Sequence, residues 1–151
     1  MQAVKNLPPI ALKIVFIYFV EVNFFVNFVG VTINPMANRT VKFYRHHFNK
    51  FFAAQTPHVK KKIAQILVWV QEVERLPNSI LRNIENVKGL YEIRIESGGN
   101  IFRIFCCFDE GNLVVLFHAF QKKTQKTPKK EIDKAQKLMN EYFKEKENGK
   151  E

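Results

Sequence analysis

The chain contains only two cysteines, and they are adjacent, at Cys106 and Cys107. Both fall in a run with the pattern of a β-strand, where successive side chains point to opposite faces, so they should not form a disulfide with each other. This cysteine usage is typical of a reducing compartment such as the cytoplasm, and it argues against a disulfide-stapled secreted domain. We therefore expect two buried, unreactive thiols.

The sequence signatures of several catalytic classes are also missing. Gly98-Gly99 is too short for a phosphate-cradling loop and indicates only a turn. The cysteine pair and the pair His46-His47 have no partners at metal-ligand spacing, so we expect neither a metal nor a cofactor. No serine or cysteine lies in a recognisable nucleophile context.

Acidic residues are outnumbered, with 14 Asp and Glu against 24 Lys and Arg, a formal net charge of +10. The resulting positive field attracts polyanions, either nucleic acid or an acidic protein. A length of 151 residues with 46% hydrophobic residues suits one domain core. The totals therefore predict one strongly basic domain.

The first 35 residues differ in character from the rest. The run from Ile10 to Ile33 is long enough to span a bilayer, but it contains Lys13 and Glu21, and charges within the run oppose insertion. Three explanations stay open: a mis-set start with the true one at Met36, a membrane-associating segment, or an extra packed element. We divide the chain into an apolar extension (1–35), one domain (36–146) and a polar tail (147–151).

Hydrophobic periodicity predicts an α+β domain of order β-α-α-β-β-β-α, in which two N-terminal helices and one C-terminal helix pack on an antiparallel sheet. The region Leu76 to Lys88 is expected to be a loop or short helix. The expected strands are Thr40 to Tyr44, Leu90 to Glu96, Ile101 to Phe108 and Leu113 to Gln121, and apolar stripes predict helices around Phe48 to Phe52, Val59 to Val73 and, after Pro128, Ile132 to Phe143.

A two-residue turn at Gly98-Gly99 would place Arg94 directly across from Arg103 on one sheet face. Like charges opposite each other destabilise a sheet, so an anion between them is a reasonable inference. Strand parity puts Tyr91 on the other face, with the core residues.

A turn about Glu110-Gly111 would place His118 opposite Arg103 and extend the row to three strands. A bulge at Gly111 would instead send His118 to the other face. His118 is therefore a candidate proton acceptor or a satisfied structural histidine.

Lysines gather where the third strand of the meander ends, with five in the nine residues from Lys122 to Lys130. Beside an arginine pair they are typical of a phosphate-binding edge, although a solvated tail has the same composition. RNA cleavage by attack of the 2′-hydroxyl needs cations that stabilise a phosphorane, and arginine and lysine can supply them.

Three segments, Leu90 to Arg94, Phe102 to Phe105 and Leu116 to Pro128, resemble the phage-derived HigB-like branch of the RelE toxin superfamily. The likeness covers about Val41 to Phe143. It implies a RelE-like fold and a type II toxin, a metal-independent endoribonuclease (mRNA interferase) that cuts mRNA on the ribosome and inhibits translation. It further implies a cognate helix-turn-helix antitoxin, a toxin–antitoxin hetero-oligomer and a cytoplasmic location.

Carried over by position, the resemblance places Arg94, Arg103, Lys122 and Lys123 where such toxins have basic residues around the scissile phosphate. Glu92 departs from the RelE pattern, because it stands where a basic residue can occur. Two rival functions remain. One is a non-catalytic RNA- or ribosome-binding domain, and the other is a membrane-active toxin that acts through residues 10–33. A membrane is an expected partner only if residues 10–33 are a genuine part of the protein. The predicted catalytic residues are Arg94, Arg103, Lys122, Lys123 and His118, and those that bind RNA or the ribosome are Lys126, Lys129 and Lys130.

Overall fold

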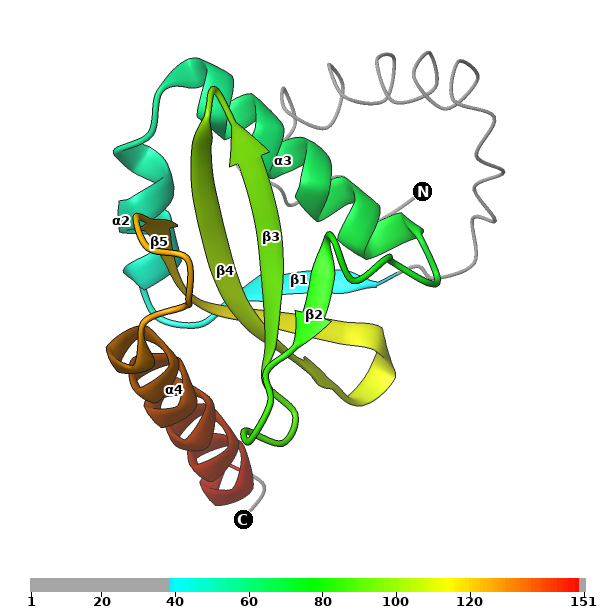
Figure 1. The fold of residues 1–151 in the computed structure, drawn as a ribbon. Helices are drawn as coiled ribbons and strands as arrows, with labels where there is room; N and C mark the ends of the chain where they lie inside the picture. Colours follow the sequence, from blue (N-terminus) through cyan, green and yellow to red (C-terminus); the bar gives the residue numbers. More distant parts are fainter. Residues whose placement is uncertain (1–38, 150–151) are drawn as a thin grey trace.

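The computed structural model describes residues 39 to 149, so the predicted apolar extension lies outside the described residues. No helix within this range is long and apolar enough to cross a membrane. The elements in chain order are β1 (Thr40–Phe43), α2 (His47–Ala53), α3 (Pro57–Glu72), β2 (Leu81–Asn83), β3 (Tyr91–Ser97), β4 (Asn100–Asp109), a short 3₁₀ helix (Glu110–Asn112), β5 (Leu113–Lys122) and α4 (Lys129–Asn148) (Figure 1).

The five strands form one sheet in the order β1-β5-β4-β3-β2. The predicted α+β class, the three helices and the three-strand meander are confirmed, each meander strand within one residue of its expected bounds. The all-antiparallel sheet is wrong at one edge, because β1 pairs with β5 in parallel. The predicted loop between α3 and β3 also contains a short strand, β2, that pairs antiparallel with β3.

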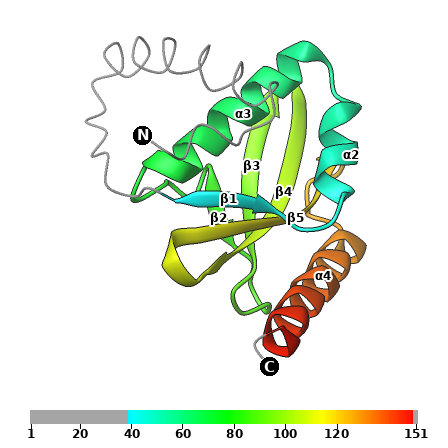
Figure 2. The ribbon, with the colours of Figure 1, turned by 180° about the vertical axis from the view of Figure 1, so that it is seen from behind.

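The helices divide between the two faces of the sheet, and in both views α3 and α4 lie at opposite ends of the molecule (Figures 1 and 2). One face packs against α2 and α3 in a core that includes Phe48, Ile63 and Ile104. The other packs against α4 in a core that includes Phe105 and Leu138.

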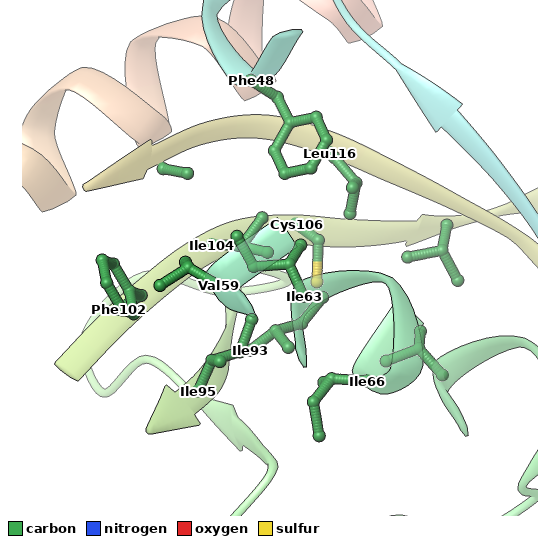
Figure 3. Packing of buried hydrophobic residues seen from close by; sticks show 13 residues of the cluster. Phe48, Val59, Ile63, Ile66, Ile93, Ile95, Phe102, Ile104, Cys106 and Leu116 are labelled. Atoms are coloured by element: carbon green, nitrogen blue, oxygen red, sulfur yellow. The ribbon is translucent and has the colours of Figure 1, made fainter. Parts of the chain in front are cut away.

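The α3 stripe is confirmed and supplies much of the first core. Val59, Ile63, Ile66 and Val70 recur at helical spacing and are all buried. Figure 3 shows several of them pointing toward the isoleucines of β3 and β4. Burying each such side chain stabilises the fold by about 1.5–3 kcal/mol. At the start of this helix, the Thr56 hydroxyl accepts a hydrogen bond from a backbone N–H as an N-cap.

The far end of α4 is fixed to the sheet through one carboxylate. The Tyr142 hydroxyl donates to Asp109 Oδ2 at 2.6 Å, and Lys146 Nζ donates to Oδ1 at 2.7 Å. Burial alone would raise the pKa of Asp109, but the hydrogen bonds from Lys146, Tyr142 and the backbone N–H of Glu110 outweigh it and lower the pKa to about 2. This carboxylate therefore stays ionised and ties α4 to the end of β4.

The adjacent cysteines behave as predicted. Both are free and buried, Cys106 in the core under α3 and Cys107 in the core under α4. Burial raises the pKa of Cys107 to about 12 and that of Cys106 further, so neither forms a thiolate near neutral pH.

The hairpin between β3 and β4 has the predicted register, with Arg94 opposite Arg103. Gly98 and Gly99 have φ angles of 58° and 75°, the positive values that a two-residue turn of this kind requires at both central positions. The local turn therefore brings the two arginines together on one face. Tyr91 lies on the other face, where its ring meets Phe108 edge-on, as predicted.

The predicted pairing of Arg103 with His118 is wrong. Arg103 pairs with Phe120 and His118 with Phe105. The three-residue 3₁₀ turn Glu110–Asn112 already moves the register by one, because it places Asp109 opposite Leu113, and a second shift between Phe105 and Cys106 moves it by one more. The shift leaves Phe117 as an extra residue in β5, a β-bulge that lets Phe117 and His118 both lie on the α4 side. His118 thus stays on the same face as Arg103, two residue pairs away along the strands.

Candidate nucleic-acid interface

Four basic side chains, one from each of four neighbouring strands, lie around one carboxylate on the sheet face that carries Phe105. They are Arg82 in β2, Arg94 in β3, Arg103 in β4 and Lys122 in β5, and the carboxylate is that of Glu92 in β3. The ladder places Arg82 opposite Glu92 and Arg94 opposite Arg103. We call these four residues the cation row.

Glu92 is the counter-ion of the arginine pair. Its carboxylate is buried, with Oε1 3.8 Å from Arg94 Nε and Oε2 3.7 Å from Arg103 Nε. These separations allow strong Coulomb attraction but are too long for hydrogen bonds. Glu92 also accepts a hydrogen bond of 3.2 Å from the Thr127 hydroxyl, which ties the loop between β5 and α4 to this face.

The arginine pair keeps unused hydrogen-bonding capacity. Arg94 Nε and Arg103 Nε are both buried, and neither has a hydrogen-bond partner within the described residues. Buried polar groups are nearly always paired, so an unpaired donor needs a reason. Two such donors within 4 Å of one shared carboxylate are consistent with a face that binds an anion.

The two arginines differ in exposure. Arg103 is only 1% exposed, and its Nη1 donates to the carbonyl of Phe102 at 2.9 Å. Burial and the charge of Arg94 lower the pKa of Arg103, against the attraction of Glu92. The side chain of Arg94 is 31% exposed, so Arg94 can touch a ligand directly while Arg103 adds positive charge from beneath.

Lys122 joins this field at the far side. It is half-buried, and its ammonium donates to the backbone carbonyl of Gln125. Its pKa is lowered, first by burial and then by the positive charges of Arg103, Arg94 and Arg82, with Glu92 acting in the opposite direction. The cation row therefore shares one electrostatic environment. Four further lysines, Lys123, Lys126, Lys129 and Lys130, are exposed in the adjoining loop and first turn of α4.

His118 is held by a different partner. Its Nε2 lies 2.5 Å from Glu131 Oε2 in the first turn of α4, and its ring is nearly parallel to those of Phe105 and Phe120, which also stack on each other. Burial lowers the pKa of His118, against the raising effect of Glu131, so the ring is neutral near pH 7. A carboxylate only accepts, so Nε2 carries the proton and Nδ1 keeps the lone pair.

Arg82 is the member of the cation row that sequence reasoning missed. The stretch from Leu76 to Lys88 has proline, asparagines and no clear periodicity, so it indicated a loop. Its three-residue strand exists only because it pairs with the edge of β3. The alternation of Leu81 with Arg82 was the one available signal, and it is too short to predict a strand.

Within residues 39 to 149, no cluster of His, Cys, Asp and Glu side chains could hold a metal ion. The charges that could act on a ligand here are therefore those of the cation row and the exposed lysines. That the protein works without a metal or a cofactor stays a prediction.

A comparison with protein-family models matches residues 50–140 to the family described as "Phage derived protein Gp49-like (DUF891)". The chain belongs to this Gp49-like family. The family is associated with toxin–antitoxin toxins of the RelE/HigB type, and this agrees with the sequence resemblance at that level. No curated protein matches the chain.

The Gp49-like match spans the whole cation row. Residues 50–140 run from the middle of α2 into α4 and include all the basic residues predicted for the site. Glu92 and Glu131, the two carboxylates that hold Arg103 and His118, also lie inside it. The interface is therefore part of the Gp49-like region and not of the sequence that precedes it.

Proposed function

We propose that this chain is the toxin of a type II toxin–antitoxin system and that it cuts mRNA on the ribosome, as in the HigB-like branch of RelE toxins. The observation that supports this most directly is the pair Arg94 and Arg103, opposite each other with buried, unpaired Nε atoms. The association of the Gp49-like family with such toxins supports the same function. Both point to an RNA phosphate as the ligand of this face.

The cleavage reaction uses a nucleophile that the RNA itself supplies. The 2′-oxygen of the RNA attacks the adjacent phosphorus, the bond to the 5′-oxygen breaks, and the products carry a 2′,3′-cyclic phosphate and a 5′-hydroxyl. The phosphorane formed between these steps has more negative charge than the starting diester. Cations fixed in advance stabilise it more than the ground state, and this difference lowers the barrier.

Each cation of the site has a role in this proposal. Arg94, partly exposed, contacts the scissile phosphate, and Arg103 raises the positive potential from beneath it. Lys122 and Lys123 act from the β5 side. The exposed Lys126, Lys129 and Lys130 bind flanking phosphates of RNA or of the ribosome, and such contacts weaken with salt.

For proton transfer we propose His118. A neutral imidazole is the form that can accept a proton, and burial keeps His118 in that form. Glu131 fixes which nitrogen carries hydrogen, so Nδ1 is the proton acceptor from the 2′-hydroxyl. In this proposal the carboxylate orients the imidazole and does not itself touch the substrate.

The partner that holds such a toxin inactive is a cognate antitoxin, which we propose to be a helix-turn-helix protein that forms a hetero-oligomer with it. A net charge of +10 favours an antitoxin with an acidic docking segment. The proposed site of action is the cytoplasm, where mRNA is translated.

Inducible expression of the full chain followed by mapping of transcript 5′ ends tests the function. We expect growth arrest and new 5′ ends that occur only in translated frames. Arg94→Ala should reduce cutting by about 100-fold or more, since loss of one preorganised donor typically costs this much. Ribosome association of Arg94→Ala, measured by co-sedimentation, should remain detectable.

Lys137→Ala is the matched control, because it removes one positive charge from an exposed position of α4. It should cut like the wild type. If the wild type sediments with ribosomes but produces no new 5′ ends, the protein is a binding domain and the cleavage proposal is wrong.

A further inference from the structure

A polar hollow opens directly beside the cation row. It has a volume of about 590 Å³, and its walls are Asn78, Ser79, Arg82, Asn83, Glu85 and Arg94. Two of these residues, Arg82 and Arg94, belong to the cation row. A ligand in the hollow would therefore lie next to any phosphate held by Arg94.

We propose that this hollow binds one nucleotide of the RNA, next to the scissile phosphate, and that it selects the base. The inference deepens the proposed function and rests on it for the identity of the polymer. In this arrangement a phosphate lies against Arg82 and Arg94, and the base lies against the side-chain amides of Asn78 and Asn83.

The size of the hollow suits such an occupant. Sites for small molecules and cofactors usually measure roughly 300 to 1,000 Å³, and the observed volume lies within this range. A base with its ribose and phosphate fills a site of this size better than a lone phosphate does.

The chemistry of the walls also fits a base. Each asparagine offers a carbonyl acceptor and an NH₂ donor, and Ser79 adds a hydroxyl that can do either. Carboxamides read base edges because they match a donor and an acceptor at once. Guanidinium groups supply the charge for the phosphate, so the two halves of a nucleotide meet two chemically different walls.

The backbone around the asparagines is fixed in advance. The amides of Ile80 and Leu81 both donate to the carbonyl of Pro77, at 2.9 and 3.0 Å, and close the turn that carries Asn78. The amide of Arg94 donates to the carbonyl of Ile80 at 2.7 Å and joins this turn to β3. A preorganised wall loses less entropy on binding than a mobile loop does.

Arg82 can turn toward a ligand at little cost. Its guanidinium is paired with Glu85 at 3.0 Å, and both side chains are at least half exposed. Exposed ion pairs of this kind contribute little free energy, so a phosphate can replace the carboxylate.

Binding of small nucleotides to the full chain tests the proposal without any need for cleavage. An NMR titration would compare the four nucleoside 3′-monophosphates with ribose phosphate and with inorganic phosphate. We expect at least one nucleotide to bind about fivefold more tightly than ribose phosphate, as one or two net hydrogen bonds would give.

Asn83→Ala and Asn78→Ala should each reduce that preference, and the double variant should abolish it while leaving the affinity for inorganic phosphate unchanged. Both positions are exposed, so the fold should persist, and the NMR spectrum of each variant checks this. Asn140→Ala, on the exposed side of α4, is the matched control and should keep the preference.

Equal affinity for all four nucleotides and ribose phosphate would overturn the base-selecting hollow. So would a preference that survives the double variant. The two proposals fail in different ways: base-selective binding without transcript cutting supports the hollow and refutes the nuclease, while cutting without base selection refutes the hollow alone.

Discussion

Replacing Glu92 with glutamine tests the electrostatic design of the cation row. The substitution keeps the shape of the side chain and an oxygen that can accept from Thr127, but removes the charge between the two arginines. Arg103, whose side chain is only 2% exposed, would then lose the carboxylate that lies 3.7 Å from its Nε. The neighbouring positive charge of Arg94 would remain.

The magnitude follows from the distances. Two unit charges about 3.7 Å apart attract by roughly 4 kcal/mol at an effective dielectric constant of about 20. Part of this is offset, because glutamine is easier to bury than a carboxylate, and breaking a buried pair typically costs about 3–5 kcal/mol. We therefore expect Glu92→Gln to lower the free energy of unfolding by about 3 kcal/mol and Tm by about 10 °C.

Urea unfolding of the full chain at neutral pH, followed by circular dichroism, measures this loss. In an Arg103→Met background, Glu92→Gln should lower the free energy of unfolding by at least about 1 kcal/mol less, because the buried guanidinium that would lose its counter-ion is already absent. Glu96→Gln is the matched control, since Glu96 lies on the same face of β3 but is exposed and acts on Arg103 more weakly than Glu92 does. A loss below about 1 kcal/mol, or an equal loss in both backgrounds, would contradict the reasoning.

Three further outcomes are expected. Asp109→Asn should lower the free energy of unfolding by about 2 kcal/mol at pH 7. The folded pKa of Asp109 is about 2, below its usual 3.8, so the wild type should lose the same stability as the pH falls from about 4 to 2. Urea unfolding at each pH measures this loss. His118→Phe should reduce cleavage by about 100-fold and lessen the fall in unfolding free energy below pH 6.5, because burial lowers the folded pKa and protons then favour the unfolded chain. Ile63→Ala should cost about 2–5 kcal/mol in unfolding free energy, since Ile63 is fully buried.

Local patterns were enough to predict much of this fold. Gly98 and Gly99 readily adopt the positive φ angles that a two-residue hairpin turn requires. A turn centred on these two glycines sets the strand register and places Arg94 opposite Arg103. The apolar stripes of α3 and α4 likewise follow from helical spacing alone. These features depend on residues a few positions apart, so the spacing of residues in the sequence predicts them.

Other features came only from contacts between distant segments. The strand β2 forms because the edge of β3 offers it hydrogen bonds, and so Arg82 joins the site. The bulge at Phe117 arises where both Phe117 and His118 pack toward α4, and together with the three-residue turn before β5 it places His118 opposite Phe105 instead of Arg103. Neither could be read from neighbouring residues.

The sequence by itself determined the basic charge, the α+β order and the arginine pair, because composition and local backbone preferences act over a few residues. Only the tertiary structure decided that Glu92 is buried between those arginines and that Glu131 holds His118. Such pairings depend on which faces pack together, and that choice is made by the whole core at once.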